Sequence, residues 1–156
     1  MRNCQSLAEI ESNSGTYVLW FVLWEEKIVS RRSGPPWRFP AGLYSYTGRD
    51  KRHLRSRLKR HLQSKKKRHW HIDWLLSGEN FEILEIWIFR NHPEWECTVN
   101  QILEAQSGAK IPVPYFGASD CKSGCQAHLE WHSQKVEPAD FGFQPDCVVR
   151  LRMPLI

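Results

Sequence analysis

The sequence predicts an α/β protein of the α+β type, in which helices cover a small mixed sheet. Two features of the chain favour this class. Short runs rich in β-branched and aromatic residues, typical of strands, occupy 16–24, 42–47 and 81–89. Between the second and third runs, Leu54, Leu58 and Leu62 recur every four residues, which is the spacing of one face of a helix. Short strands separated by helices pack as one sheet with helices against it.

The strands can be placed in order along the chain. Residues 16–24 (TYVLWFVLW) are apolar throughout, which predicts a buried strand. Residues 42–47 alternate apolar and small side chains, as expected of a strand with one packed face, and Gly48 ends it. Residues 81–89 are apolar on both faces, which favours a central place in the sheet. A further strand is expected at 28–31 and a late one at 143–151.

Three helices are expected, and the start of each has a sequence signal. Asp50 can cap a helix that runs to about Ser64. A short helix follows at 71–76. Pro93 suits the first turn of a third helix, at 93–105. Ahead of all these elements, the polar residues 1–14 predict a loose N-terminal arm.

The composition is that of a single domain, because 156 residues suffice for one sizeable core. The longest apolar run, 17–24, is too short to cross a membrane. Five cysteines form an odd set, and no secretory pattern is visible at the N-terminus. These features favour free thiols and a reducing, cytoplasmic location without a membrane partner.

Positive charge is concentrated in one segment. Residues 49–71 hold eleven lysines and arginines and one acid, so the segment carries +10. The remaining 11 basic and 16 acidic residues give the rest of the chain −5. Such a concentration indicates a binding surface for a polyanion, with nucleic acid the favoured partner and a merely solvated helix face the alternative.

Four features within and around this segment occur in a particular order. Gly15-Thr16-Tyr17 opens the first strand and Tyr46-Thr47-Gly48 closes a later one. Arg57 and His61 follow one helical turn apart, and Glu96 falls in the helix after the next strand. In this order the residues resemble the GIY-YIG nuclease superfamily. Both tripeptides keep the flanking Gly and Tyr, but have Thr where the family usually has an apolar residue.

Longer stretches are similar to one branch of that superfamily. They are GLYSYTG at 42–48, HWHIDWLL at 69–76, FGASDC at 116–121 and His128-Leu129. The branch consists of small GIY-YIG domain proteins of poorly assigned function, some of them found beside endonuclease III-like domains. The resemblance implies a mainly antiparallel sheet flanked by helices over residues 15–132, with an inserted hairpin within 25–41. Residues 133–156 would be a C-terminal extension packed on the domain, and a repair-type protein is a candidate partner.

The resemblance also implies catalytic roles. Glu96 would bind one Mg²⁺ or Mn²⁺ ion, as a carboxylate that leaves the ion several waters. Arg57 would bind the reacting phosphate through its planar, permanently charged group. His61 would relay a proton or orient the attacking water. Tyr17 and Tyr46 would line the position of that water, and either could be the base.

One family feature is missing. The asparagine that many members carry downstream of the metal-binding glutamate has no counterpart after Asn100. Its role is therefore either empty or taken by Ser119 or Asp120.

Further basic residues are candidates for nucleic-acid binding. They are Arg49, Arg60, Lys65, Lys66, Lys67, Arg68, His69 and His71. For the two histidines the alternative is equally good: Trp70, Ile72 and Trp74 would pack a short helix while the histidines are solvated.

A cysteine and histidine cluster follows. Cys121, Cys125, His128 and His132 have a spacing that could bind zinc. The four lie within twelve residues, with no second ligand pair evident, so a plain cysteine-bearing loop is favoured over a zinc site.

Two functions are compatible with these patterns. The first is a metal-dependent endonuclease that hydrolyses DNA phosphodiesters, with structure-dependent or weakly specific action and with RNA not excluded. The alternative is a nucleic-acid-binding module that keeps the fold and the basic surface without cleavage.

Overall fold

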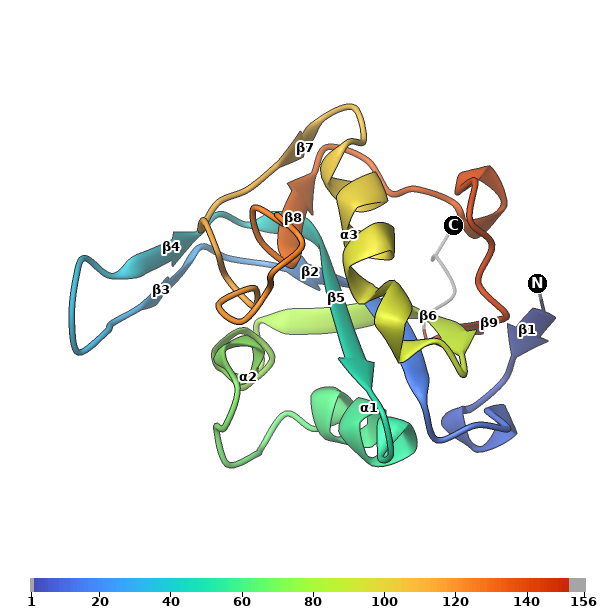
Figure 1. Cartoon of the computed structure of the whole chain (residues 1–156). Helices are drawn as coiled ribbons and strands as arrows, with labels where there is room; N and C mark the ends of the chain where they lie inside the picture. The colour runs from blue at the N-terminus through green and yellow to red at the C-terminus, as the bar shows by residue number, and fades with distance from the viewer. Residues whose placement is uncertain (1, 152–156) are drawn as a thin grey trace, which may run out of the picture.

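The structure, a computed structural model, describes residues 2–151 and confirms the α+β class with a mainly antiparallel sheet (Figure 1). Within these residues the main sheet has seven strands in the order β1-β9-β6-β2-β5-β8-β7. Their bounds are β1 Arg2–Cys4, β2 Gly15–Leu23, β5 Gly42–Asp50, β6 Phe81–Arg90, β7 Ala109–Lys110, β8 Leu129–His132 and β9 Cys147–Arg150. Strand β2 lies at the centre and pairs antiparallel with β5 and β6 along its whole length.

Helices cover both faces of this sheet. Helices α1 (Leu54–Leu62) and α2 (His71–Leu75) pack on the face that carries Leu19 and Phe21 of β2. Helix α3 (Glu96–Glu104) packs on the opposite face, against Val18 and Trp20. This division follows from the sequence, because successive side chains of a strand point to opposite faces and β2 is apolar on both.

The N-terminal residues are not a loose arm, contrary to expectation. Strand β1 pairs in parallel with β9, and a short helix, η1 (Leu7–Glu9), follows it. Cys4 and Cys147 form a disulfide across this pair, with Cα atoms 5.8 Å apart. The expectation of free thiols is therefore wrong for these two cysteines. Residues 143 positions apart meet only because both chain ends join the same edge of the sheet.

Helix α1 begins three residues later than expected, because its cap is His53 rather than Asp50. Strand β5 continues to Asp50, which pairs with Gly15 of β2. The Asp50 carboxylate does accept backbone N–H groups, those of Arg52 and His53, but it does so in the turn that precedes the helix. The third expected helix divides into a 3-10 turn, η2 (Pro93–Trp95), and α3.

The insert and the C-terminal segment also form defined elements. Strands β3 (Lys27–Val29) and β4 (Trp37–Phe39) form the hairpin expected within 25–41. The late strand is shorter than 143–151, and it lies inside the sheet beside β6, after a 3-10 turn, η3 (Pro138–Asp140). The segment from 133 is thus partly a sheet strand, and residues 152–156 of the expected extension lie outside the described part. None of the described helices has the length and apolarity needed to span a membrane.

Candidate active site

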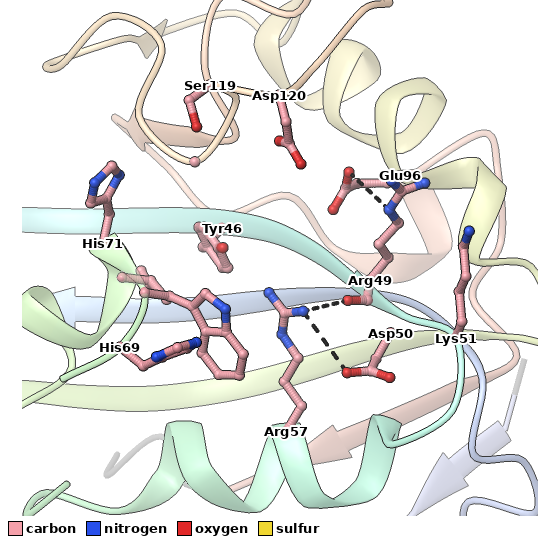
Figure 2. Close-up of a pocket in the computed structure, with 13 residues that line it drawn as sticks. Tyr46, Arg49, Asp50, Lys51, Arg57, His69, His71, Glu96, Ser119 and Asp120 are labelled. Atoms are coloured by element: carbon pink, nitrogen blue, oxygen red, sulfur yellow. Dashed lines mark hydrogen bonds and ion pairs between the residues drawn. The ribbon is translucent and has the colours of Figure 1, made fainter. Parts of the chain in front are cut away.

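A cleft of about 540 Å³ opens beside the end of β5 (Figure 2). Strand β8 pairs with β5 only as far as Tyr46, so the last residues of β5 have no strand on their outer side within the described sheet. Helix α1, the start of α2, the start of α3 and the loop 117–120 surround this edge. The lining residues are Tyr46, Arg49, Asp50, Lys51, Arg57, His69, Trp70, His71, Ile72, Glu96, Gly117, Ser119 and Asp120.

The two motif tyrosines lie on the same face of adjacent strands. Tyr17 pairs with Gly48, and Tyr46 pairs with Leu19, so both rings face α1. A Cβ atom at Gly48 would lie 2.4 Å from the Tyr17 hydroxyl oxygen. The last position of the second tripeptide therefore needs glycine, because the ring of Tyr17 lies directly over it.

Tyr17 and His61 lie beneath the cleft rather than in its wall. Both side chains are fully buried, and the Tyr17 hydroxyl is 2.7 Å from Nε2 of His61. Burial, together with the charges of Arg57 and Lys66, lowers the pKa of His61 to about 3, so the ring is neutral at pH 7. Of the two tyrosines expected to line the position of the attacking water, Tyr46 lines the cleft and Tyr17 does not.

Arg57 is held at the cleft wall by three neighbours. Its Nη1 donates to the backbone carbonyl of Arg49 at 2.8 Å and lies 3.9 Å from the Asp50 carboxylate. The guanidinium stacks over the Trp70 ring, with its central carbon 4.3 Å from the ring centroid. A cation fixed on an aromatic face and a carbonyl has little freedom left to lose on binding a phosphate.

Glu96 approaches the same cleft from the first turn of α3. Its Oε1 lies 3.7 Å from Arg49 Nε and 3.7 Å from His128 Nδ1. Burial raises the pKa of Glu96 to about 7; Arg49 and Arg57 oppose this rise, and the nearby Asp120 carboxylate adds to it. Although α1 and α3 cover opposite faces of the sheet, Arg57 and Glu96 both line this cleft beside the end of β5 (Figure 2).

The candidate nucleic-acid contacts divide into three groups. Arg49, His69 and His71 line the cleft. Lys65, Lys67 and Arg68 are exposed in the segment without helix or strand that leads to His69. Arg60 and Lys66 instead have structural contacts.

Arg60 pairs with the buried carboxylate of Asp73 at 2.7 Å and so ties α1 to α2. Lys66 donates to the backbone carbonyl of His61 at 2.9 Å, and burial lowers its pKa to about 8. These contacts account for the basic residues at positions 60 and 66, and neither requires a bound ligand.

The cysteine and histidine cluster has a different membership from that expected. Cys97, Cys121, Cys125 and His128 bring their ligand atoms within 4.8 Å of one another, a grouping that could hold a metal ion. His132 is not part of it, because its Nε2 lies 2.8 Å from the Ser45 hydroxyl in the core. Sequence reasoning did not include Cys97 among the ligands. It lies 24 residues before Cys121, and the one hint in the sequence is that it follows the candidate site residue Glu96.

The fold and the cleft define a small α+β domain whose basic cleft contains tyrosine, arginine and glutamate side chains. The sequence model of one family, the domain of unknown function DUF123, matches residues 16–143. The chain therefore belongs to the DUF123 family. Neither the curated proteins nor the solved structures searched contain a match.

Proposed function

We propose that this protein is a metal-dependent endonuclease that hydrolyses phosphodiester bonds in DNA. One observation carries the proposal: Tyr46, Arg57 and Glu96 come from three different elements and face one basic cleft. This combination offers a group near the attacking water, a cation for the phosphate and a carboxylate for a metal ion, which are the parts that phosphodiester hydrolysis requires.

Glu96 and Asp120 are the groups that would hold Mg²⁺ or Mn²⁺. Both are carboxylates that line the cleft, and oxygen donors of this kind suit hard divalent ions. The Asp120 carboxylate contributes to the raised pKa of Glu96, and a cation bound by both groups would offset this repulsion. When bound, such an ion supplies Lewis-acid stabilisation of the phosphate oxygens. Asp120 would thus take the role of the asparagine that many GIY-YIG nucleases carry and this chain lacks.

Arg57 would bind the reacting phosphate. Its Arg49, Asp50 and Trp70 contacts fix the guanidinium at the cleft wall, where its remaining N–H groups can donate to phosphate oxygens. An oriented cation stabilises charge that develops in the transition state without having to reorganise.

Tyr46 is the better candidate for the group that contacts the attacking water. It lines the cleft, whereas Tyr17 is fully buried and hydrogen-bonded to His61. Burial raises the pKa of Tyr46 to about 12, with Arg57 opposing the rise. Tyr17 and His61 would act as positioning residues beneath it, since the Tyr17 and Tyr46 ring centroids lie 6.5 Å apart.

The basic residues around the cleft would hold the flanking phosphates. Arg49, Lys51 and His69 line it, and Lys65 and Lys67 add exposed positive charge in the segment that leads to His69. Contacts to the backbone of the nucleic acid carry no sequence information directly, so action that depends on DNA structure is expected.

The test is a cleavage assay on linear, nicked and branched DNA, with matched RNA, in buffers that contain Mg²⁺, Mn²⁺ or no divalent ion. We expect cleavage of at least one DNA substrate that requires the added ion. Tight binding of the same substrates without any cleavage would instead support the non-catalytic binding module.

A further inference from the structure

The ligand atoms of the Cys97 cluster lie within 4.8 Å of one another, close enough to share one metal ion. Cys97 Sγ lies 3.4 Å from Cys121 Sγ and 3.9 Å from His128 Nε2. A zinc–sulfur bond of about 2.3 Å places the ligand atoms of a regular tetrahedron about 3.8 Å apart. These two separations lie on either side of the zinc value, and the cluster would have to contract only where a pair approaches its 4.8 Å limit.

The ligands come from two parts of the chain. Cys121, Cys125 and His128 belong to one loop, and Cys97 comes from the first turn of α3. Structural zinc sites commonly join a close ligand pair to ligands elsewhere in the sequence. The apparent crowding within twelve residues, which argued against zinc from the sequence, disappears once Cys97 replaces His132.

Hydrogen-bond donors surround the sulfur atoms. The backbone N–H of Ser123 points to Cys121 Sγ at 3.4 Å, and Gln101 Nε2 lies 3.7 Å from Cys125 Sγ. Donors of this kind support metal-bound thiolates, which carry negative charge and accept hydrogen bonds. A neutral thiol sulfur accepts hydrogen bonds only weakly, so such donors stabilise it less than they stabilise a thiolate.

Hydrogen bonds, rather than regular secondary structure, hold this loop: its own backbone supplies some, and Asn100, Gln101 and Glu104 of α3 supply others. Residues 111–128 include no helix or strand, although Cys125, Ala127 and His128 are buried. A metal ion that joined this loop to α3 would fix Ser119 and Asp120 against the cleft.

We propose that Cys97, Cys121, Cys125 and His128 bind one Zn²⁺ ion in a closed site with four protein ligands, and that this zinc centre positions Glu96. His128 directs Nε2 toward the cysteines and Nδ1 toward Glu96 Oε1, at 3.7 Å. Zinc on Nε2 leaves the hydrogen on Nδ1, facing the carboxylate. The 3.7 Å separation is longer than a hydrogen bond, so Glu96 would move closer to accept it. Carboxylate–histidine–zinc arrangements of this kind fix both groups. The zinc site stands independently, whereas the positioning of Glu96 rests on the proposed function.

Zinc binding is tested first by metal analysis of the full chain purified without chelator, and by the absorption of the Co²⁺-substituted protein. We expect one zinc ion per chain and the d–d and sulfur-to-cobalt bands of a tetrahedral thiolate site. Cys125→Ser and Cys121→Ser should lose the metal. Lys122→Ala, in the same loop but with an exposed side chain, should keep it. Folded wild-type protein that stays free of zinc after refolding with Zn²⁺, with its three free thiols all reactive, would overturn the site.

The positioning of Glu96 is tested with His128→Cys, which can keep a zinc site with four cysteines but has no Nδ1 donor. Zinc content and thermal stability should stay near wild type, while Mn²⁺ affinity at Glu96, followed by electron paramagnetic resonance, should fall about 10-fold to 100-fold. Loss of zinc in this variant would instead confirm His128 as a ligand. Unchanged Mn²⁺ affinity with zinc retained would refute the positioning role but not the zinc site. A wild type that binds zinc but neither binds Mn²⁺ nor cleaves would refute the proposed function alone.

Discussion

The hydroxyl oxygen of Tyr17 lies 2.7 Å from Nε2 of His61, and neither side chain has exposed surface. Two residues 44 positions apart thus form one buried polar pair. It lies next to Tyr46, on the same face of the sheet. A buried polar pair of this kind is costly to break, because the partner left behind stays unsatisfied. The pair therefore holds α1 against β2 below the cleft.

The two tyrosines should differ in their effect on cleavage. Tyr46→Phe removes the hydroxyl that faces the cleft, and we expect kcat to fall by about 10² or more. Tyr17→Phe should have a smaller effect on kcat and a larger effect on stability, because it leaves His61 Nε2 without its partner. Single-turnover kinetics and urea unfolding of both variants check this. Equal losses of kcat with unchanged stability would contradict the division of roles.

His61 should make folding stability depend on pH. Its pKa is about 3 in the folded protein, below its ordinary value of 6.5. Above pH 6.5 the ring is neutral in both states; as pH falls from 6.5 toward 3, the unfolded chain gains a proton that the folded protein excludes, so stability is lost.

The measurement is the free energy of unfolding of wild type and His61→Gln across that range. The variant should be less stable than wild type above pH 6.5, and the difference should shrink on acidification. Because His128 and His132 are present in both proteins, their own titration largely cancels. A difference that stays constant with pH would contradict the buried, neutral state of His61.

Gly48→Ala should destabilise the protein by about 1–3 kcal/mol, because the new methyl group has no space beside Tyr17. Gly142→Ala is the matched control, since no atom lies within 4 Å of a Cβ there. It should change stability by less than about 0.5 kcal/mol. Thermal or urea unfolding gives both values, and equal stabilities for the two variants would show that Tyr17 does not constrain the glycine.

Lys65 and Lys67 should contribute to binding of nucleic acid through charge alone. Replacing both by alanine should reduce the slope of log Kd against log salt by up to about 0.9 for each phosphate that is no longer neutralised. Arg32→Ala with Arg38→Ala, on the exposed β3–β4 hairpin, removes the same charge elsewhere. Fluorescence anisotropy over a salt series compares the two. Identical slopes in both double variants would place the binding surface away from the cleft.

The strands and helices that build the cleft could be predicted from sequence because their patterns are long. Strands β2 and β6 are nine and ten residues of mostly apolar sequence, and α1 carries leucines at helical spacing. Strands β1, β7 and β8 have two to four residues, too few for a periodic pattern, and are held by their neighbours in the sheet.

The pairings that sequence reasoning missed join distant parts of the chain. Cys97 meets Cys121 across 24 positions, and Cys4 meets Cys147 across 143. Spacing along the sequence carries no trace of such pairs. The burial of His61 could not be predicted from the sequence either, because a histidine next to the apolar face of a helix can point into a cleft or into the core.

The most direct test of the account is cleavage by Glu96→Gln, compared with Glu94→Gln as a control. Glu94 lies two residues away on the same segment, with an exposed side chain paired to His92. We expect Glu96→Gln to retain DNA affinity and zinc content but to lose Mg²⁺-dependent or Mn²⁺-dependent cleavage, because the amide cannot hold the ion. Glu94→Gln should cleave like wild type. A Glu96→Gln protein as active as wild type would contradict the proposed metal-dependent mechanism.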